Sequence, residues 1–310
     1  MTVESAPQAD INHTAHSASV DLTTGLAPPS VPLRAALWTA SRTLRALGPV
    51  RYALADALGV AVWARSRERA QRTAANHRRL QPSLDAANAR RRARASFREF
   101  TRTSFDFVWA YAVPPQRMRR YFTTQDIDHI LNALRTYNGA VIALAHYGSW
   151  DVAAACALYL NIPITTVMTT VGGSDLATRI AAWARRKQDL EVLMTQGAAT
   201  GLMNAVRSGR CDAILSDIPD RGQRAIVDFC GGKVAFSTAP AWIARTTGVP
   251  IMAAHCWREH GRYVLRVYPP MLIGESQSDA DVMQRIASTL EPQIRRMPEQ
   301  WYPFGRVYRN

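Results

Sequence analysis

A histidine and an aspartate five residues apart, His146 and Asp151, have the types and spacing best suited to chemistry in this chain. An apolar run over residues 140–145 ends at His146, and Gly148 lies between the two polar residues. On a continuous helix an offset of five turns two side chains roughly 140° apart, so the pair can meet only across a turn. Gly148 supplies the conformational freedom for that turn. A histidine held by a carboxylate is the arrangement of a general base.

The residues alone leave a purely structural role for this pair equally open. A histidine at the end of a strand is often part of the packing. An aspartate in the first turn of a helix, here the one expected over residues 152–159, is a common cap and is favoured by the helix dipole. Spacing therefore shows only that His146 and Asp151 can meet.

A second polar group follows the apolar run 213–216. It contains Asp217, Asp220 and Arg221, and Gly222 comes next. A strand that runs into a loop with two acids and an Arg-Gly step is a candidate site loop, although acids and glycine also make ordinary turns. His146 and Asp217 both fall beyond the carboxyl ends of expected strands, which is where open α/β sheets hold their sites.

Short apolar segments alternate with helical ones from residue 138 onward. This alternation predicts an α/β fold, with a central, mostly parallel sheet flanked by helices. The expected strands cover residues 140–145, 164–169, 190–194, 213–216, 225–229, 251–257 and 263–268. The expected helices cover residues 152–159, 176–188, 198–208, 240–246 and 279–296.

Three parts of the chain differ in composition. Residues 1–30 read as a disordered leader. Residues 31–136 form an N-terminal amphipathic helical part, in which the Gly48-Pro49 step divides two helices. Residues 137–310 form the α/β core, and 31–310 should be one structural unit. Apolar faces flanked by arginine suit helices in a lipid interface, and equally suit ordinary packing on a core.

The chain is strongly basic, with a formal net charge of +14. Arginine supplies almost all of it, because Lys187 and Lys233 are the only lysines. Such a surface favours an anionic partner: nucleic acid, an anionic membrane leaflet or a phosphorylated substrate. No nucleic-acid-binding module is recognisable, which favours the second and third.

The four cysteines are well spread and show no Cys-x-x-Cys pairing. We expect them to be reduced core residues: Cys156, Cys211, Cys230 and Cys256. No histidine, cysteine and carboxylate cluster has metal-ligand spacing, so no metal and no cofactor are expected. The chain shows neither a signal peptide nor an apolar run of about 18 residues. These features predict a cytoplasmic protein, soluble or attached to a membrane surface.

The motif His146-Tyr147-Gly148-Ser149-Trp150-Asp151, directly after a strand, resembles the HxxxxD signature of the glycerolipid acyltransferase superfamily. More narrowly, it resembles the branch that contains the lipid A acyltransferases and the phosphatidylinositol mannoside acyltransferases. The loop from Asp217 to Gly222 and the closing run Pro298-Glu299-Gln300-Trp301 resemble later blocks of that branch. The resemblance extends over residues 65–309.

The resemblance implies an acyltransferase that moves a long-chain fatty acyl group from acyl-CoA, or from acyl carrier protein, to a glycolipid hydroxyl. The acceptor would be a phosphatidylinositol mannoside or, alternatively, a lipid A precursor. The missing N-terminal membrane span is closer to the peripheral mannoside enzymes. Peripheral attachment to the cytoplasmic face of the cell membrane is therefore expected.

The resemblance also implies roles for named residues. His146 would take the proton of the acceptor hydroxyl, and Asp151 would hold the imidazole. No serine nucleophile is needed, and the Gly-x-Ser-x-Gly elbow of a hydrolase is absent. Backbone amides near Tyr147 and Gly148, or an arginine, would stabilise the oxyanion. The substrate would contact Tyr147, Gly148, Ser149, Trp150, Asp217, Asp220 and Arg221.

A rival hypothesis from another class is a non-enzymatic protein whose basic helices bind anionic lipid or nucleic acid. It predicts steeply salt-dependent binding to nucleic acid. It also predicts indifference to changes at His146 and Asp151.

Overall fold

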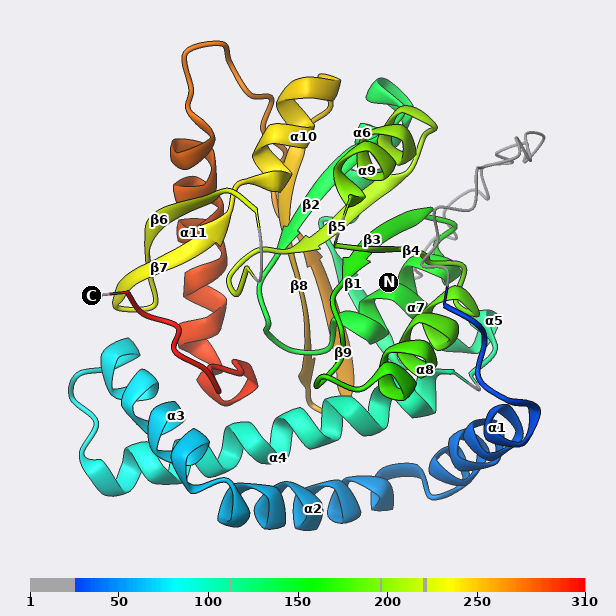
Figure 1. Ribbon diagram of the computed structural model, residues 1–310, viewed down its shortest axis with the longest axis vertical. Helices are drawn as coiled ribbons and strands as arrows, with labels where there is room; N and C mark the ends of the chain where they lie inside the picture. Colours follow the sequence, from blue (N-terminus) through cyan, green and yellow to red (C-terminus); the bar gives the residue numbers. More distant parts are fainter. Residues whose placement is uncertain (1–25, 112, 196, 220–221, 310) are drawn as a thin grey trace, which may run out of the picture.

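The computed structural model describes residues 26–309 except 112, 196, 220 and 221 (Figure 1). Most of the expected leader therefore lies outside the described residues, and residues 26–30 belong to no helix or strand. The layers seen in Figure 1 are a helical N-terminal part, a central sheet and helices on both faces of that sheet.

The N-terminal part is helical, as predicted. Its first five helices are α1 (Val31–Ala46), α2 (Arg51–Arg65), α3 (Arg67–Leu80), α4 (Ala86–Ala110) and the short α5 (Pro115–Met118). A 3₁₀ turn over Gly48–Val50 separates α1 from α2 at the predicted Gly-Pro step. The long α4 begins where the Asp85 side chain accepts a hydrogen bond from the Asn88 N–H. In Figure 1, α4 crosses beneath the sheet and α2 lies on its outer side.

The central sheet has seven strands in the order β1-β9-β8-β2-β5-β3-β4. The strands β8, β2, β5, β3 and β4 run parallel, whereas β9 pairs antiparallel with β8. The mostly parallel α/β fold is thus confirmed. The strand bounds are β1 (Phe122–Gln125), β2 (Ala140–Leu144), β3 (Ile164–Met168), β4 (Glu191–Met194), β5 (Cys211–Leu215), β8 (Ile251–Glu259) and β9 (Arg262–Val267).

Two strands were not predicted from the sequence. The edge strand β1 pairs with β9, although it falls within the part expected to be helical. Three of its four residues are exposed, so it shows no apolar run. The strand β7 (Gly232–Ser237) pairs antiparallel with β6 (Arg224–Phe229). These two form a separate two-stranded sheet, so the strand predicted over residues 225–229 lies outside the central sheet.

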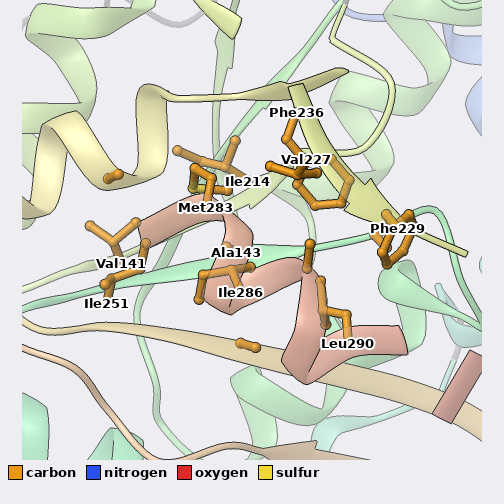
Figure 2. Packing of buried hydrophobic residues seen from close by; sticks show 14 of the residues in the cluster. Val141, Ala143, Ile214, Val227, Phe229, Phe236, Ile251, Met283, Ile286 and Leu290 are labelled. Atoms are coloured by element: carbon orange, nitrogen blue, oxygen red, sulfur yellow. The ribbon is translucent and has the colours of Figure 1, made fainter. Parts of the chain in front are cut away.

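Helices cover both faces of the sheet, and the sheet separates two large clusters of the hydrophobic core. On one face β2 and β5 pack with residues of the β6–β7 hairpin and α11, as Figure 2 shows for Ala143, Ile214 and Ile286. On the other face, α6, α7 and α8 bury Ile142 of β2. The remaining helix bounds are α6 (Asp128–Tyr137), α7 (Trp150–Tyr159), α8 (Asp175–Arg186), α9 (Ala198–Arg207), α10 (Ala239–Thr247) and α11 (Asp279–Arg296), followed by a 3₁₀ turn over Pro298–Gln300.

The sheet divides next to the histidine motif. Strands β2 and β8 are paired only up to Ala143 and Ala253, although β8 continues to Glu259. Beyond Ala253, β8 pairs only with β9 on its other edge. One edge of β8 is therefore available to the turn that follows β2.

The four cysteines are buried and free, as predicted. No helix in the described part of the chain combines the length and the apolar character that crossing a membrane requires.

Candidate active site

The register of two parallel strands brings His146 and Asp217 together. Leu144 of β2 is paired with Leu215 of β5, and each polar residue lies two positions beyond its leucine. The ladder continues one step further, because the Ser216 N–H donates to the Leu144 carbonyl over 2.8 Å. Both side chains therefore reach the same edge of the sheet, at the carboxyl ends of its strands.

His146 and Asp217 form a closely hydrogen-bonded pair. Nδ1 of His146 lies 2.7 Å from Oδ1 of Asp217. The His146 backbone N–H also donates to both carboxylate oxygens, at 3.0 and 3.1 Å. Asp217 is buried, whereas the His146 side chain is 28% exposed. A neutral imidazole that donates through Nδ1 keeps the Nε2 lone pair for a proton, which is the arrangement of a general base.

Asp151 has a different partner from the one predicted. Its carboxylate accepts hydrogen bonds from Nε and Nη2 of Arg185 on α8, at 2.8 and 3.3 Å. The prediction that Asp151 holds the His146 imidazole is thus corrected: Asp217 takes that place. Burial alone would lower the pKa of Arg185, but the Asp151 carboxylate more than offsets this and raises it above its ordinary value. The ion pair fixes the start of α7 against α8.

The turn after β2 is held by backbone hydrogen bonds. The Tyr147 N–H donates to the Ala145 carbonyl over 2.7 Å, and the Gly148 N–H donates to the Gln300 carbonyl over 2.8 Å. These amides were predicted to be oxyanion donors, but both already have acceptors within the protein. Gly148 has φ +65°, and a Cβ there would lie 2.0 Å from the Cys256 carbonyl oxygen. Only glycine fits this turn without strain.

The other predicted substrate contacts are divided between the site and the core. The Trp150 ring meets the His146 ring edge to face, with centroids 5.5 Å apart. The Tyr147 hydroxyl is turned inward, where it accepts a hydrogen bond from the Gln293 side chain. Ser149 is buried at the start of α7. Asp220 and Arg221 lie outside the described residues.

An apolar cavity of about 760 Å³ opens beside His146. Its volume is within the range of roughly 300–1,000 Å³ that is typical of small-molecule sites. Its wall includes residues of both faces of the sheet, such as Ile142 on one side and Ile214 on the other. Ile218 and Trp242 line it and are also exposed, so they mark where it reaches the surface. Buried aliphatic residues in its wall are Ile130, Ala154, Ala157, Ile162, Leu190 and Val267.

The Asp151–Arg185 ion pair has only a weak signal in the sequence. Arg185 stands in a run of basic residues at the end of a helix, a pattern that usually marks a solvated face. Its partnership with Asp151 depends on how α8 packs on α7. The pairing of His146 with Asp217 could have been predicted, because both residues follow strands that end at one edge of the sheet.

The family described as "Bacterial lipid A biosynthesis acyltransferase" matches this sequence over residues 32–310. The chain belongs to this family. It is therefore an acyltransferase, which disfavours the hypothesis of a non-enzymatic basic protein. The predicted superfamily is confirmed.

Two named relatives are similar to this member of the family. The phosphatidylinositol mannoside acyltransferase of Mycolicibacterium smegmatis is 27% identical over 212 residues, which cover 67% of this chain and 68% of the relative. The enzyme of the same name from Mycobacterium tuberculosis is 28% identical over 180 residues, 57% of this chain and 56% of the relative. The match thus spans little more than half the length of the second relative.

Among solved structures, the chain is similar to the 1-acyl-sn-glycerophosphate acyltransferase PlsC from Thermotoga maritima. The match has a TM-score of 0.41 and 11% sequence identity, and covers 86% of this chain and 97% of that one. At this level of similarity it does not bear on the function of this family member.

Proposed function

We propose that this acyltransferase transfers a long-chain fatty acyl group from acyl-CoA to a hydroxyl of a membrane glycolipid. His146 acts as the general base and Asp217 orients it. The observation that carries the proposal is the His146–Asp217 hydrogen bond of 2.7 Å beside a deep apolar cavity. The pair supplies proton transfer, and the cavity supplies a site for a hydrocarbon chain.

The reaction needs no covalent enzyme intermediate. Nε2 of His146 takes the proton of the acceptor hydroxyl as its oxygen attacks the thioester carbonyl carbon. The tetrahedral intermediate collapses with breakage of the carbon–sulfur bond, and the imidazolium returns the proton to the leaving thiolate. The products are an ester and a free thiol. The Asp217 carboxylate stabilises the imidazolium and fixes the ring so that Nε2 faces the acceptor.

The cavity suits the acyl chain of the donor. Its wall includes buried aliphatic side chains such as Ile130 and Ile162. Each methylene moved from water into such surroundings contributes about 0.8 kcal/mol, so a long chain is bound far more tightly than a short one. Because His146 also lines the cavity, a chain lying in it brings its carbonyl carbon near Nε2.

The acceptor we propose is a phosphatidylinositol mannoside. Two relatives that carry this name support the proposal. A lipid A precursor is the alternative acceptor, because the family as a whole is described by lipid A biosynthesis. For the donor, acyl carrier protein is the alternative to acyl-CoA.

We also propose that residues 31–136 attach the protein to the cytoplasmic face of the cell membrane. Four apolar side chains at a spacing of four are exposed, one directly before α2 and three along it: Val50, Leu54, Leu58 and Val62. On α1, Trp38 is exposed and lies beneath the Arg42 guanidinium. Apolar side chains flanked by arginine match the chemistry of an anionic bilayer, whose acyl and phosphate groups they would contact.

The experiment is a transfer assay with the purified protein. Radiolabelled palmitoyl-CoA and palmitoyl carrier protein are each offered with phosphatidylinositol mannoside or a lipid A precursor. The proposal predicts transfer from the CoA thioester to the mannoside, and a loss of at least about 100-fold in His146→Ala. A His146→Ala protein that transfers palmitate at the wild-type rate would overturn the catalytic assignment.

A further inference from the structure

The edge of β8 that faces the catalytic turn lacks a neighbouring strand. Because β2 leaves β8 after the Ala143 and Ala253 pair, other groups satisfy the backbone of β8 beyond that point. The Cys256 carbonyl accepts a hydrogen bond from the Ser149 N–H over 2.7 Å. Two residues further on, the backbone of Arg258 is satisfied by a side chain.

That side chain is Gln300, which pairs with Arg258 as a strand would. Its Oε1 accepts from the Arg258 N–H over 2.9 Å, and its Nε2 donates to the Arg258 carbonyl over 2.7 Å. A side-chain amide offers an acceptor and a donor side by side, as this arrangement requires. Gln300 is 4% exposed, so water does not readily replace either bond.

Arg258 is a firmly held anchor for this pairing. Its guanidinium forms ion pairs with Glu99 and Asp106 of α4, the latter at 2.8 Å. The Arg258 side chain is 10% exposed. Gln300 therefore forms hydrogen bonds with a part of β8 that is fixed to α4.

The backbone of residues 300–302 forms hydrogen bonds with the catalytic turn. The Gln300 carbonyl accepts from the Gly148 N–H over 2.8 Å, and the Tyr302 N–H donates to the His146 carbonyl over 3.2 Å. Between these bonds, Tyr147 and Trp301 form an isolated antiparallel bridge. The segment 300–302 thus bonds to both β8 and the turn, and Gln300 contributes to each of these contacts.

We propose that Gln300 is a positioning residue for His146. Its amide fixes segment 300–302 to β8, and that segment fixes the backbone of the turn so that the imidazole meets Asp217. This inference rests on the proposed function, in which the His146–Asp217 pair is the catalytic base. Gln300 touches no substrate and acts only through the turn.

The decisive variant is Gln300→Glu, with Gln284→Glu as its matched control. An ionised glutamate keeps the shape of glutamine but cannot donate to the Arg258 carbonyl. Gln284 makes the same two-point pairing elsewhere, with the backbone N–H and carbonyl of Asp228 at 2.8 and 3.0 Å. It joins α11 to β6 and has no bond to the turn. Gln300→Met, which is neutral and similar in length, replaces Gln300→Glu if that variant does not fold.

Two readouts separate positioning from general stability. The first is the downfield proton resonance of the His146 Nδ1–H, assigned by its absence in His146→Ala. We expect it to broaden or vanish in Gln300→Glu and to persist in Gln284→Glu. The second is steady-state transfer, in which Gln300→Glu should lower kcat at least tenfold with KM changed less than threefold. Gln284→Glu should leave both within twofold of the wild type.

The outcomes separate this inference from the proposed function. An unchanged Nδ1–H resonance in a folded Gln300 variant would overturn the positioning role, whatever the enzyme transfers. An equal loss of kcat in both variants would also overturn it, since a general effect of the substitution would then suffice. Wild-type protein without transfer activity would refute the proposed function, while the resonance would still test how the turn is held.

Discussion

Asp151 of the HxxxxD motif is bonded to Arg185, with its Oδ1 2.8 Å from the arginine Nε. The two side chains are only 10% and 17% exposed, so each charge depends on the other for its compensation. The aspartate of the motif thus supports the site by joining α7 to α8, while Asp217 meets the histidine.

The Asp151–Arg185 ion pair predicts how substitutions at Asp151 change the free energy of unfolding. Asp151→Asn leaves the Arg185 charge buried without a counter-ion, so we expect a loss of about 3–5 kcal/mol in the free energy of unfolding. Urea denaturation measures it. In Asp151→Asn combined with Arg185→Met, both charges are gone, and much of that loss should be recovered. Additive losses in the double variant would show that the two residues are not coupled.

The cavity predicts a dependence on acyl chain length. Ala157→Leu adds bulk to the buried part of the cavity wall that α7 supplies. The expected result is a shift of the preferred donor from long to shorter acyl chains, with turnover of the shorter ones retained. A series of acyl-CoA donors measures kcat/KM for each length. Ala199→Leu, at an exposed position of the same cavity, is the control and should leave the optimum unchanged. An unchanged optimum in Ala157→Leu would place the acyl chain elsewhere.

The exposed face of α2 predicts membrane attachment. Leu54→Glu with Leu58→Glu removes two exposed apolar side chains and adds negative charge. Binding to vesicles that contain anionic lipid should fall at least about tenfold, as a sedimentation assay would show. The matched control is Ile226→Glu with Leu272→Glu, because these side chains are equally exposed on other parts of the protein. Equal losses in both double variants would argue against a specific face.

A buried carboxyl away from the site predicts a pH dependence of stability. Burial, and then the nearby Glu191 charge, raise the pKa of Asp212 to about 8. The folded protein therefore holds a proton that the unfolded chain releases near pH 4, so Asp212 makes stability fall as pH rises from about 4 to 8. Asp212→Asn removes this dependence. The free energy of unfolding of Asp212→Asn minus that of the wild type should increase as pH rises from about 4 to 8, by up to a few kcal/mol. Above about pH 8 this difference should stay constant. A constant difference across the range would contradict the assignment.

The sequence predicted the parallel core well because both faces of that sheet are covered by helices. Strands such as Ala140–Leu144 are consequently unbroken apolar runs. The strands Phe122–Gln125 and Gly232–Ser237 escaped prediction, and neither belongs to the parallel core of the central sheet. One is largely exposed at the sheet edge, and the other belongs to a separate hairpin. Their pairing is decided by tertiary contacts that local pattern does not record.

The sequence indicated the histidine and the two carboxylates of the candidate site but not how they pair. His146, Asp151 and Asp217 were all identified from motif and position, and the turn at Gly148 was expected. Sequence proximity favoured Asp151 as the partner of His146. The register of β2 with β5 instead brings Asp217 to the His146 ring. The position of α8 beside α7 brings Arg185 into an ion pair with Asp151. Such partners are set by strand order and helix packing, which spacing along the chain does not specify.

The central claim is that Asp217 is the carboxylate that makes His146 a base. The most direct measurement is kcat for acyl transfer by Asp217→Asn, which keeps the side-chain shape and one acceptor for the His146 N–H. We predict a fall of about 10²–10⁴-fold at little change in KM. Asp151→Asn, compared at a temperature where both variants are folded, should lose far less. Wild-type kcat in Asp217→Asn, with the larger loss in Asp151→Asn, would contradict the account.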